Sequence, residues 1–473
     1  MPPAPAYGLA YTPATIPRLR APAIDDLPVG VRFVRIQWTD LTNITRCRVV
    51  PLPAFRALLQ SSRPGVAITV AALGILGAGL AEGFSGTGEY VLVPEMDTLR
   101  VCAYAPGHAS VVGYFQLKEP EPGRSLAVPL CPRTLLRRIE EDARAAGIEY
   151  LVGVETEFIL LSGTEPMTGT STAPWSSTAG LYTGTISATV LEEITNDLQR
   201  SGIEVLMYHA EAAPGQFEIV TGPLPPLQAA DAVVLTRETI YNVASKHGLR
   251  ATFAPRIFSD SPGSAAHTNI SLHRTPGSPI LESSPDATSA APFLTAPERS
   301  FLQAVLTHLP ALAAFTLPTH ASYARVKDGV WSGGTYASWG RDNREAAIRV
   351  TGSAGARRFE IRTVDGTASP HVALAALLGA GTRGVRDGAE LQIKEVLVGA
   401  AELSDAERAE RGIVARLPAS AELARQNLLQ DTVVREILGE EFVGKYVKVN
   451  EALQKFMAAD GPDEEMKKLV EMY

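Results

Sequence analysis

Cysteine is scarce in this sequence, and an excess of basic charge is absent. The three cysteines among 473 residues, Cys47, Cys102 and Cys131, are odd in number and scattered. They form neither a disulfide framework nor a zinc-binding spacing, which favours a reducing compartment. The net charge of −8, from 43 basic and 51 acidic residues, leaves no electrostatic footprint for nucleic acid. We therefore expect a cytoplasmic protein with no nucleic-acid partner.

Long apolar runs are missing as well. The longest, residues 66–81 (VAITVAALGILGAGLA), is interrupted by three glycines and falls short of the roughly 20 residues that a bilayer span needs. We expect a buried helix or loop there and no membrane partner. The Pro- and Ala-rich residues 1–27 lack an apolar segment behind a basic start, so we expect an arm, not a signal peptide.

Two common nucleotide-binding motifs are also missing. The chain contains no GxxxxGK[ST] loop, which excludes a P-loop protein. It also contains no GxGxxG after a strand.

The composition that remains, 45% apolar and 20% charged, is that of a globular protein long enough for several domains. Alternation in residues 31–40, a Thr/Asn turn and RCRVVPL predict a β-hairpin that opens a small domain over residues 28–130. Helical spacing in residues 132–147 and a strand at 150–161 then open a larger domain, residues 131–473. Its strands and helices alternate, which by itself suggests an α/β unit.

The strand YLVGVETEFILL carries the first candidate site residues. Alternation places Glu155 and Glu157 on one face and the apolar residues Val152 and Phe158 on the other. Two carboxylates on one face repel unless a cation lies between them. Taken alone, however, the pair fits a solvated outer face equally well.

Four further segments carry side chains suited to metals or anions. In the first, Glu211 and Glu218 lie seven residues apart on either side of a Pro-Gly break. In the second, His267 follows a loop of small residues. In the third, a strand alternates apolar residues with the charged residues Arg358, Glu360 and Arg362. In the fourth segment, residues 323–349, four arginines surround a Gly-rich turn with Trp331. Carboxylates with imidazole bind Mg²⁺ or Mn²⁺, and arginines beside such metals clamp phosphoryl groups. The residues alone predict a metal-dependent enzyme that handles phosphates and carboxylates.

Five motifs occur in an order and spacing that resemble the glutamine synthetase superfamily, and within it the glutamine-synthetase-like, fluG-type proteins of fungi: GVETEFIL, HAEAAPGQFE, GSAAHTNISL, SWGRDNREAAIRV and RRFEIRTVDGTASPHVALAALLGAG. The resemblance covers nearly the whole chain after the arm. It implies an α+β fold with a β-grasp-like N-terminal domain. The catalytic domain that follows has an antiparallel sheet backed by helices, in place of a plain α/β unit. It also implies a homo-oligomeric ring whose active sites are shared between subunits.

The resemblance further implies a reaction in which ATP phosphorylates the γ-carboxylate of glutamate and an amine displaces the phosphate. By resemblance, one Mg²⁺ or Mn²⁺ has the ligands Glu157, Glu211 and Glu218, and a second has Glu155, His267 and Glu360. Arg325 corresponds to the arginine at the α-carboxylate of glutamate, Arg362 to the one at the γ-carboxylate, and Arg344 and Arg349 to those at the ATP phosphates. Arg344 and Arg362 also take catalytic and substrate-binding roles. Gly263 falls at a substrate contact, and Ser271 and Arg358 at nucleotide contacts.

The sequence departs from this family on the side where ammonium binds. Glutamine synthetases have a glutamate in the loop between the arginines at 325 and 344 that takes a proton from ammonium. Counted from one end that place falls on Trp331, and from the other on Ser332. Asp328 and Glu345 lie nearby at the wrong offsets for a base that must reach the amine. The family's Asp-Gly-Ser-Ser loop is missing from GLAEGFSGTGEYVLVPE.

Two smaller departures concern the phosphates and the acid. Asn269 stands where family members often have a histidine, and Pro262 where they have an asparagine.

The predicted metal ligands and arginines are thus present, and the losses gather on the ammonium side. A tryptophan among glycines offers apolar and π surface to a larger amine, although it could also only shape the loop. We predict an ATP- and Mg²⁺-dependent γ-glutamyl-amide ligase that joins glutamate, or a similar acid, to an organic amine. The alternatives are a true glutamine synthetase with another base, a non-catalytic nucleotide-binding signalling or scaffold protein, and phosphoryl transfer without amide formation.

Overall fold

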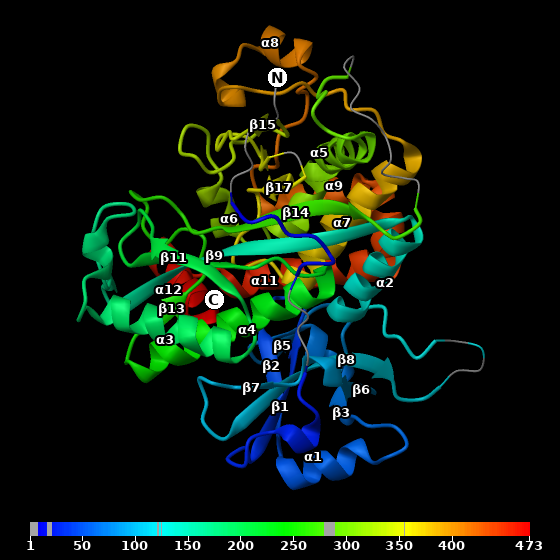
Figure 1. The fold of residues 1–473 in the computed structure, drawn as a ribbon, viewed down its shortest axis with the longest axis vertical. Coiled ribbons are helices and arrows are strands. Elements are labelled where there is room, and N and C mark those ends of the chain that lie inside the picture. The colour runs from blue at the N-terminus through cyan, green and yellow to red at the C-terminus, as the bar shows by residue number, and fades with distance from the viewer. Residues whose placement is uncertain (1–7, 17–20, 121–122, 124, 279–288, 354) are drawn as a thin grey trace.

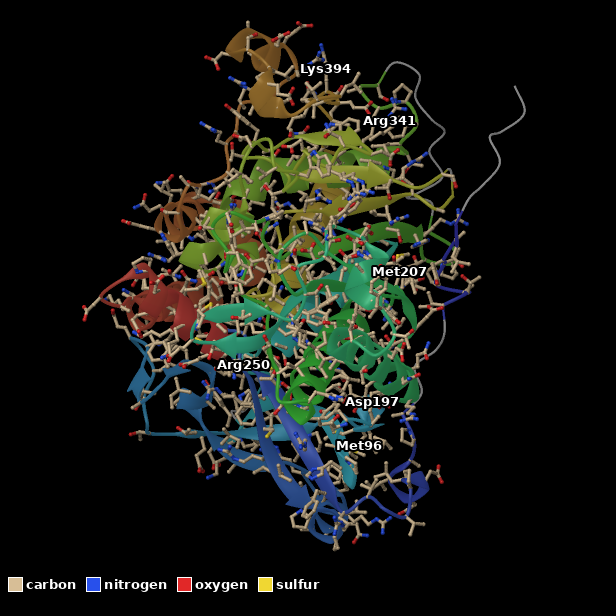
Figure 2. The ribbon with its side chains drawn as sticks, turned by 90° about the vertical axis from the view of Figure 1, so that its left-hand side faces the viewer. Met96, Asp197, Met207, Arg250, Arg341 and Lys394 are labelled. Carbon is tan, nitrogen blue, oxygen red and sulfur yellow. The ribbon has the colours of Figure 1, made fainter. Side chains whose placement is uncertain are left out.

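The computed structural model describes residues 8–16, 21–120, 123, 125–278, 289–353 and 355–473. Residues 1–7 and 17–20 of the predicted arm lie outside the described residues. Two sheets organise the chain, a smaller N-terminal one at the bottom of Figure 1 and a larger one above it. Figure 2 shows the same division from the side, with Met96 in the lower part and Arg341 and Lys394 at the opposite end. None of the helices in the described ranges has the length and apolar character for crossing a membrane.

The N-terminal sheet has six strands in the order β2-β1-β8-β6-β3, with β7 paired to β8. The predicted hairpin is confirmed, since β1 and β2 pair antiparallel from Phe33–Pro51 to Thr39–Thr45. β1 and β8 are parallel, and the other pairs are antiparallel. This mixed sheet with one helix after its first hairpin is the β-grasp-like arrangement that we expected. The elements are β1 (Phe33–Thr39), β2 (Thr45–Pro51), α1 (Leu52–Leu59), β3 (Val66–Thr69), β6 (Glu89–Pro94), β7 (Arg100–Val101) and β8 (His108–Leu117).

The apolar run at residues 66–81 contains no α-helix, so our expectation of a buried helix or loop was wrong in part. It forms β3, a 3₁₀ turn at Val70–Leu73 and a small hairpin of β4 (Ile75–Leu76) and β5 (Gly79–Leu80). Gly77 between these strands has a φ of 54°, a left-handed conformation that favours glycine. Gly77 therefore turns the chain between β4 and β5.

The larger sheet has nine strands, ordered β11-β12-β9-β14-β17-β16-β15, with β10 and β13 also paired to β9. Neighbours are antiparallel except for β15 and β16. The antiparallel sheet that the resemblance implies is confirmed, and the plain α/β unit is wrong, because local alternation does not reveal strand direction. The strands are β9 (Ile148–Thr164), β10 (Met167–Gly169), β11 (Val205–Ala210), β12 (Gln216–Thr221), β13 (Arg250–Thr252), β14 (Ala266–Arg274), β15 (Trp339–Arg341), β16 (Ile348–Thr351) and β17 (Arg358–Ile361).

Helices cover one face of this sheet. α2 and α4 pack on β9, and α7 packs against α2, α4 and α5; in Figure 1, β9 and β14 cross in front of α7. The C-terminal segment is helical, as predicted. The helices are α2 (Pro132–Ala145), α3 (Ile186–Arg200), α4 (Pro226–Lys246), α5 (Ala296–Thr316), α6 (His320–Arg325), α7 (Pro370–Asp387), α8 (Asp405–Glu410), α9 (Ala421–Gln430), α10 (Thr432–Leu438), α11 (Glu440–Met457) and α12 (Pro462–Met472).

A buried ion network ties the two sheets together at the start of α2. The Arg133 guanidinium lies 2.9 Å from Glu95, after β6, and 2.9 Å from Asp231 on α4. Burial opposes the charge on Arg133, but Asp231 and Glu95 outweigh it and raise its pKa. The domain boundary that we predict between residues 130 and 131 stays a prediction and falls just before this helix.

Candidate active site

The predicted site residues form a row across the large sheet because strand register places them opposite one another. His209 on β11 pairs with Glu218 on β12, and Glu218 pairs with Glu157 on β9. Directly opposed residues in neighbouring strands present their side chains on the same face. The register continues with the pairs Glu155–His267, Asn269–Glu360 and Glu360–Arg349.

The alternation of residues along β9 explains why the site residues lie on the face of the sheet opposite the helices. Val152, Phe158 and Leu160 are buried in the core, on the face that the helices cover. Glu155 and Glu157 therefore point to the opposite face. Glu157 is itself buried, so the pair does not form a solvated outer face.

The row borders a cavity of about 860 Å³. Every predicted site residue lines it except Glu360, which is buried and bonds to Arg349 and Arg362. The residues in the lining are Glu155, Glu157, Glu211, Glu218, Gly263, His267, Ser271, Arg325, Trp331, Arg344, Arg349, Arg358 and Arg362.

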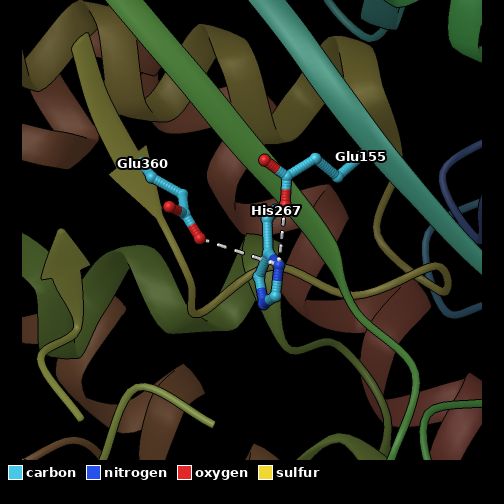
Figure 3. Close-up of side chains that lie close together, drawn as sticks. All are labelled: Glu155, His267 and Glu360. Atoms are coloured by element: carbon cyan, nitrogen blue, oxygen red, sulfur yellow. Dashed lines mark hydrogen bonds and ion pairs between the residues drawn. The ribbon is translucent and has the colours of Figure 1, made fainter. Parts of the chain in front are cut away.

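Glu155, His267 and Glu360, from three adjacent strands, meet in one group that could hold a metal ion (Figure 3). His267 Nδ1 lies 3.2 Å from a Glu155 oxygen and 3.8 Å from a Glu360 oxygen. Burial and the nearby Arg362 lower the pKa of His267 well below its ordinary value. The imidazole is therefore neutral at pH 7 and can offer a lone pair. These are the residues predicted to share the second metal.

Glu157, Glu211 and Glu218, predicted to share the first metal, are divided between two groups. Glu157 and Glu218 meet with His267, whereas Glu211 and Glu218 meet with His209. The two His209 ring nitrogens lie 3.3 Å from Glu211 and 3.3 Å from Glu218. Sequence reasoning missed His209, although its place two residues before Glu211 on the same strand face was a usable signal.

Burial and the closeness of Glu157, Glu211 and Glu218 to one another raise the pKa values of Glu157 and Glu211. Burial raises the pKa of Glu157 well above its ordinary value, and Glu218 and Glu211 add to the rise. Burial and Glu218 raise the pKa of Glu211 to about 7. The hydrogen bond to Glu218, with the charges of both carboxylates, raises the pKa of His209 to about 9. Buried carboxylates that hold on to protons, beside the neutral imidazole of His267, fit a site that binds divalent cations.

Gln216, on β12, is a second residue that sequence reasoning missed. Its side-chain amide donates to a Glu157 oxygen at 3.0 Å, and the Ala265 N–H donates to the same oxygen at 3.0 Å. These two donors fix the orientation of Glu157 toward the cavity.

Arg325 is buried, yet it belongs to the cavity lining. Nη2 donates to the carbonyls of Arg362 at 3.1 Å and Val364 at 3.4 Å, while Nε has no hydrogen-bond partner among the described residues. Burial lowers its pKa. Gly263 packs against it, since an added Cβ would lie 2.6 Å from Arg325 Cγ. A cationic fork with an unused donor is suited to a carboxylate ligand.

The other arginines surround Glu360 and the metal-binding groups. Arg349 Nη1 lies 2.8 Å from Glu360, and Arg362 pairs with the same carboxylate. Arg344 is exposed in the cavity lining. Arg358 Nε donates to Asn269 at 3.0 Å. Arg341, the remaining arginine of residues 323–349, instead pairs with Glu395 at 2.8 Å.

Backbone hydrogen bonds hold the loop around Trp331, and the indole side chain of Trp331 lines the cavity. Trp331 has a φ of 57°, uncommon for a bulky residue, and its side chain is 65% exposed. Its N–H donates to Glu345, and its carbonyl accepts from Arg362 Nη2 at 2.7 Å. The Trp331 side chain is therefore exposed at the cavity and not packed in the core.

Ser332 and the nearby acids are used inside this loop. The Ser332 hydroxyl donates to the Lys327 carbonyl at 2.7 Å and accepts from the Lys327 N–H at 2.9 Å. Asp328 accepts from the Thr335 N–H at 2.7 Å. Glu345 accepts from the N–H groups of Gly329 and Trp331. These bonds hold the loop in shape, and they leave Trp331 as the residue that presents its side chain to the cavity.

A second tryptophan borders the same cavity and was missed from the sequence. Trp175, in the segment between β10 and α3, is 57% exposed and forms a hydrogen bond to Glu211. Val330 lies in the lining as well. The signal was weak, since a lone tryptophan in a Thr/Ser-rich loop has no periodicity to place it.

Known proteins match this chain along most of its length. Residues 129–467 match the family described as glutamine synthetase, catalytic domain. The protein fluG of Emericella nidulans is 35% identical over 94% of this chain, and the chain spans about half of that protein's length, 49%. The γ-glutamylpolyamine synthetase GlnA3 of Streptomyces coelicolor is 34% identical, with 87% of each protein covered. A solved structure described as a novel glutamine synthase homolog superposes with a TM-score of 0.78 at 28% identity, covering 94% of this chain and 99% of its own.

Metal affinity should fall as the pH falls, because Glu211 and Glu157 have raised pKa values. The pKa of Glu211 is raised to about 7 and that of Glu157 is raised well above its ordinary value, so a cation must displace the protons that these carboxylates retain as the pH falls. We expect the apparent Kd for Mn²⁺, measured by calorimetry, to rise at least about tenfold from pH 8 to pH 6. Glu211→Gln should weaken binding and flatten the profile, whereas Glu192→Gln, at an exposed position on α3, should change neither. An affinity independent of pH would contradict this assignment.

Proposed function

Because the chain belongs to the glutamine synthetase family, we propose that it uses ATP to activate the γ-carboxylate of glutamate, or of a similar acid, and joins it to an organic amine other than ammonia. One observation carries this proposal. The cavity combines the carboxylates, imidazoles and arginines needed for phosphoryl transfer with two exposed tryptophans, and one of these, Trp331, falls by counting from Arg325 at the place expected for the acid that handles ammonium.

Mg²⁺ or Mn²⁺ would be held by Glu155, His267 and Glu360 and by Glu157, Glu211 and Glu218, with His209 as a further candidate beside the last two. When bound, such ions neutralise the polyphosphate and polarise the reacting oxygens. The protein's part is to orient these ligands, as Gln216 does for Glu157 and Asn269 for Glu155, each through a hydrogen bond of 3.0 Å.

The arginines divide between the acid and the phosphates. Arg325 would bind the α-carboxylate, and Arg362 would lie at the γ-carboxylate. Arg344 and Arg349 would hold the phosphates, and Ser271 and Arg358 would contact the nucleotide. Guanidinium groups that are fixed before the reaction, as Arg349 and Arg362 are by Glu360, stabilise charge that develops at the transferred phosphoryl group.

The reaction balances in two steps. A γ-carboxylate oxygen attacks the terminal phosphorus of ATP, and the bond from that phosphorus to ADP breaks. The product is an acyl phosphate, from which phosphate is a good leaving group. The amine nitrogen then attacks the acyl carbon, the carbon–oxygen bond to phosphate breaks, and the nitrogen loses a proton. The products are ADP, inorganic phosphate and a γ-glutamyl amide.

The amine side supports an organic acceptor. Trp331, Trp175 and Val330 line the cavity, while Glu345 and Asp328 use their carboxylates to hold the loop. Ammonium is small and strongly hydrated and gains from a carboxylate, whereas an alkyl or aryl amine buries its apolar part on indole faces. The relative from Streptomyces coelicolor named as a γ-glutamylpolyamine synthetase supports the same class of acceptor. From the family resemblance, we also propose a homo-oligomeric ring with shared active sites.

An amine panel tests this function. With ATP, Mg²⁺ and glutamate, phosphate release should be at least about tenfold more efficient, as kcat/KM, with the preferred monoamine, diamine or polyamine than with ammonium. Reactions without glutamate serve as the control. Ammonium as the preferred acceptor would establish a true glutamine synthetase. Nucleotide binding without glutamate-dependent ADP formation, with any amine, would favour a non-catalytic protein.

Replacing Trp331 tests the proposed amine wall. Trp331→Glu should lower kcat/KM for the preferred amine about tenfold, through loss of the apolar and π face, and raise relative turnover with ammonium. Trp331→Phe keeps a ring and should retain amine preference. All three are L residues, so the left-handed backbone strains them in the same way. Tyr182→Glu, at an exposed aromatic outside the cavity lining, controls for added charge. Unchanged preference in Trp331→Glu would show that the tryptophan is not the selector.

A further inference from the structure

The N-terminal arm reaches the same cavity, although it precedes β9 by more than a hundred residues. Gly8, Leu9 and Tyr11 belong to the cavity lining. In Figure 1 this segment, drawn in blue, runs in front of β9 and β14. An arm was expected here from the sequence, but its contact with the site was not.

Hydrogen bonds place Tyr11 at one end of the cavity. Its hydroxyl donates to Glu204 Oε1 at 3.4 Å, and the Glu204 carbonyl accepts from the Gly222 N–H at 3.0 Å. The residues that flank Gly222 lie over β9, because a Cβ on Gly153 would meet Thr221 at 3.6 Å and Pro223 at 3.7 Å. Tyr11 therefore lies near Gly153.

The pairing of β9 with β14 shows how far Tyr11 lies from the candidate metal-binding groups. Gly153 pairs with Asn269, and Leu151 with Ser271, on β14. Ser271 lies four residues beyond His267, or roughly 13 Å along a strand. The Trp331 loop instead bonds to Arg362, just after β17 and close to His267. The arm and the tryptophan loop are thus walls at different ends of one cavity, and the arm is at the end of Ser271.

Exposed apolar side chains lie at the arm's end of the cavity, beside the polar residues Thr221 and Ser271. Leu9 is 72% exposed, and Met207 of β11, labelled in Figure 2 on the side over which the arm runs, is 54% exposed. Leu151, Val220 and Pro223 complete this part of the lining. Exposed apolar side chains gathered at one end of a cavity favour a flat, weakly polar ligand. Thioether and phenol groups in particular pack well on aromatic rings.

We propose that residues 8–11 of the arm form the outer wall of a slot for the purine base of the nucleotide, with Leu9 and Tyr11 as contacts opposite Met207. The inference rests on the proposed use of ATP, whose phosphates Arg344 and Arg349 would hold nearer the middle of the cavity. The arm then selects for the base, while the arginines bind the phosphates.

Binding of ADP and of pyrophosphate to the full chain, both with Mg²⁺, separates these two contributions. In Leu9→Ala and in Tyr11→Ala, the affinity for ADP measured by calorimetry should fall about fivefold, and the affinity for pyrophosphate should stay constant. Tyr11→Phe keeps the ring and should bind ADP as the unmodified chain does. Leu397→Ala, at a leucine that is 82% exposed and outside the cavity lining, is the matched control and should change neither affinity.

Three results would overturn the slot: unchanged ADP affinity in both alanine variants, equal losses for ADP and pyrophosphate, or a loss in Tyr11→Phe as large as in Tyr11→Ala. An unmodified chain that binds pyrophosphate as tightly as ADP would overturn it too. None of these measurements includes an amine. The base slot can therefore fail while the amine ligase stands, and it can stand if the preferred acceptor is ammonium.

Discussion

Strand register is the constraint on which the rest of the site depends. His209, Glu218 and Glu157 are opposed across three strands, and Glu155 is opposed to His267 on the next. A slip of one residue in β9 would turn its glutamates into the helix-packed core and its apolar residues into the cavity. Burial of Val152 and Phe158 thus holds the metal-binding carboxylates in place, and Arg349 and Arg362 offset part of the charge that this concentrates.

Arg362 connects Glu360 to the Trp331 loop. Its guanidinium pairs with Glu360 and donates to the Trp331 carbonyl, while Glu345 holds the Trp331 N–H. The tryptophan is therefore presented by the same group that would lie at the reacting carboxylate. The loop can change its exposed side chain without disturbing the backbone bonds that position it. Under the proposed function, this arrangement would allow a new acceptor to be selected while the phosphoryl-transfer chemistry is kept.

Features that depend on motif order or on residue periodicity could be predicted from the sequence. Five motifs in a fixed order predicted the family, and alternating residues predicted the first hairpin; both predictions are confirmed. Strand direction was not visible locally, so the residues alone suggested the wrong sheet. Trp175 and the arm lie in segments without periodicity, and their partners are distant in the chain. Counting could not choose between Trp331 and Ser332, because the two counts differ by one residue; the structure adds that the Ser332 hydroxyl is used inside the loop. The metal and nucleotide roles stay predictions.

The central claim is that acyl-phosphate chemistry is retained while the acceptor is an organic amine. Glutamate labelled with ¹⁸O in its γ-carboxylate, incubated with ATP, Mg²⁺ and the preferred amine, tests this directly by mass spectrometry of both products. We predict one ¹⁸O transferred to inorganic phosphate for each γ-glutamyl amide formed, because the carboxylate oxygen leaves with the phosphoryl group. Phosphate without label, or labelled phosphate formed without an amide of the amine, would contradict the account.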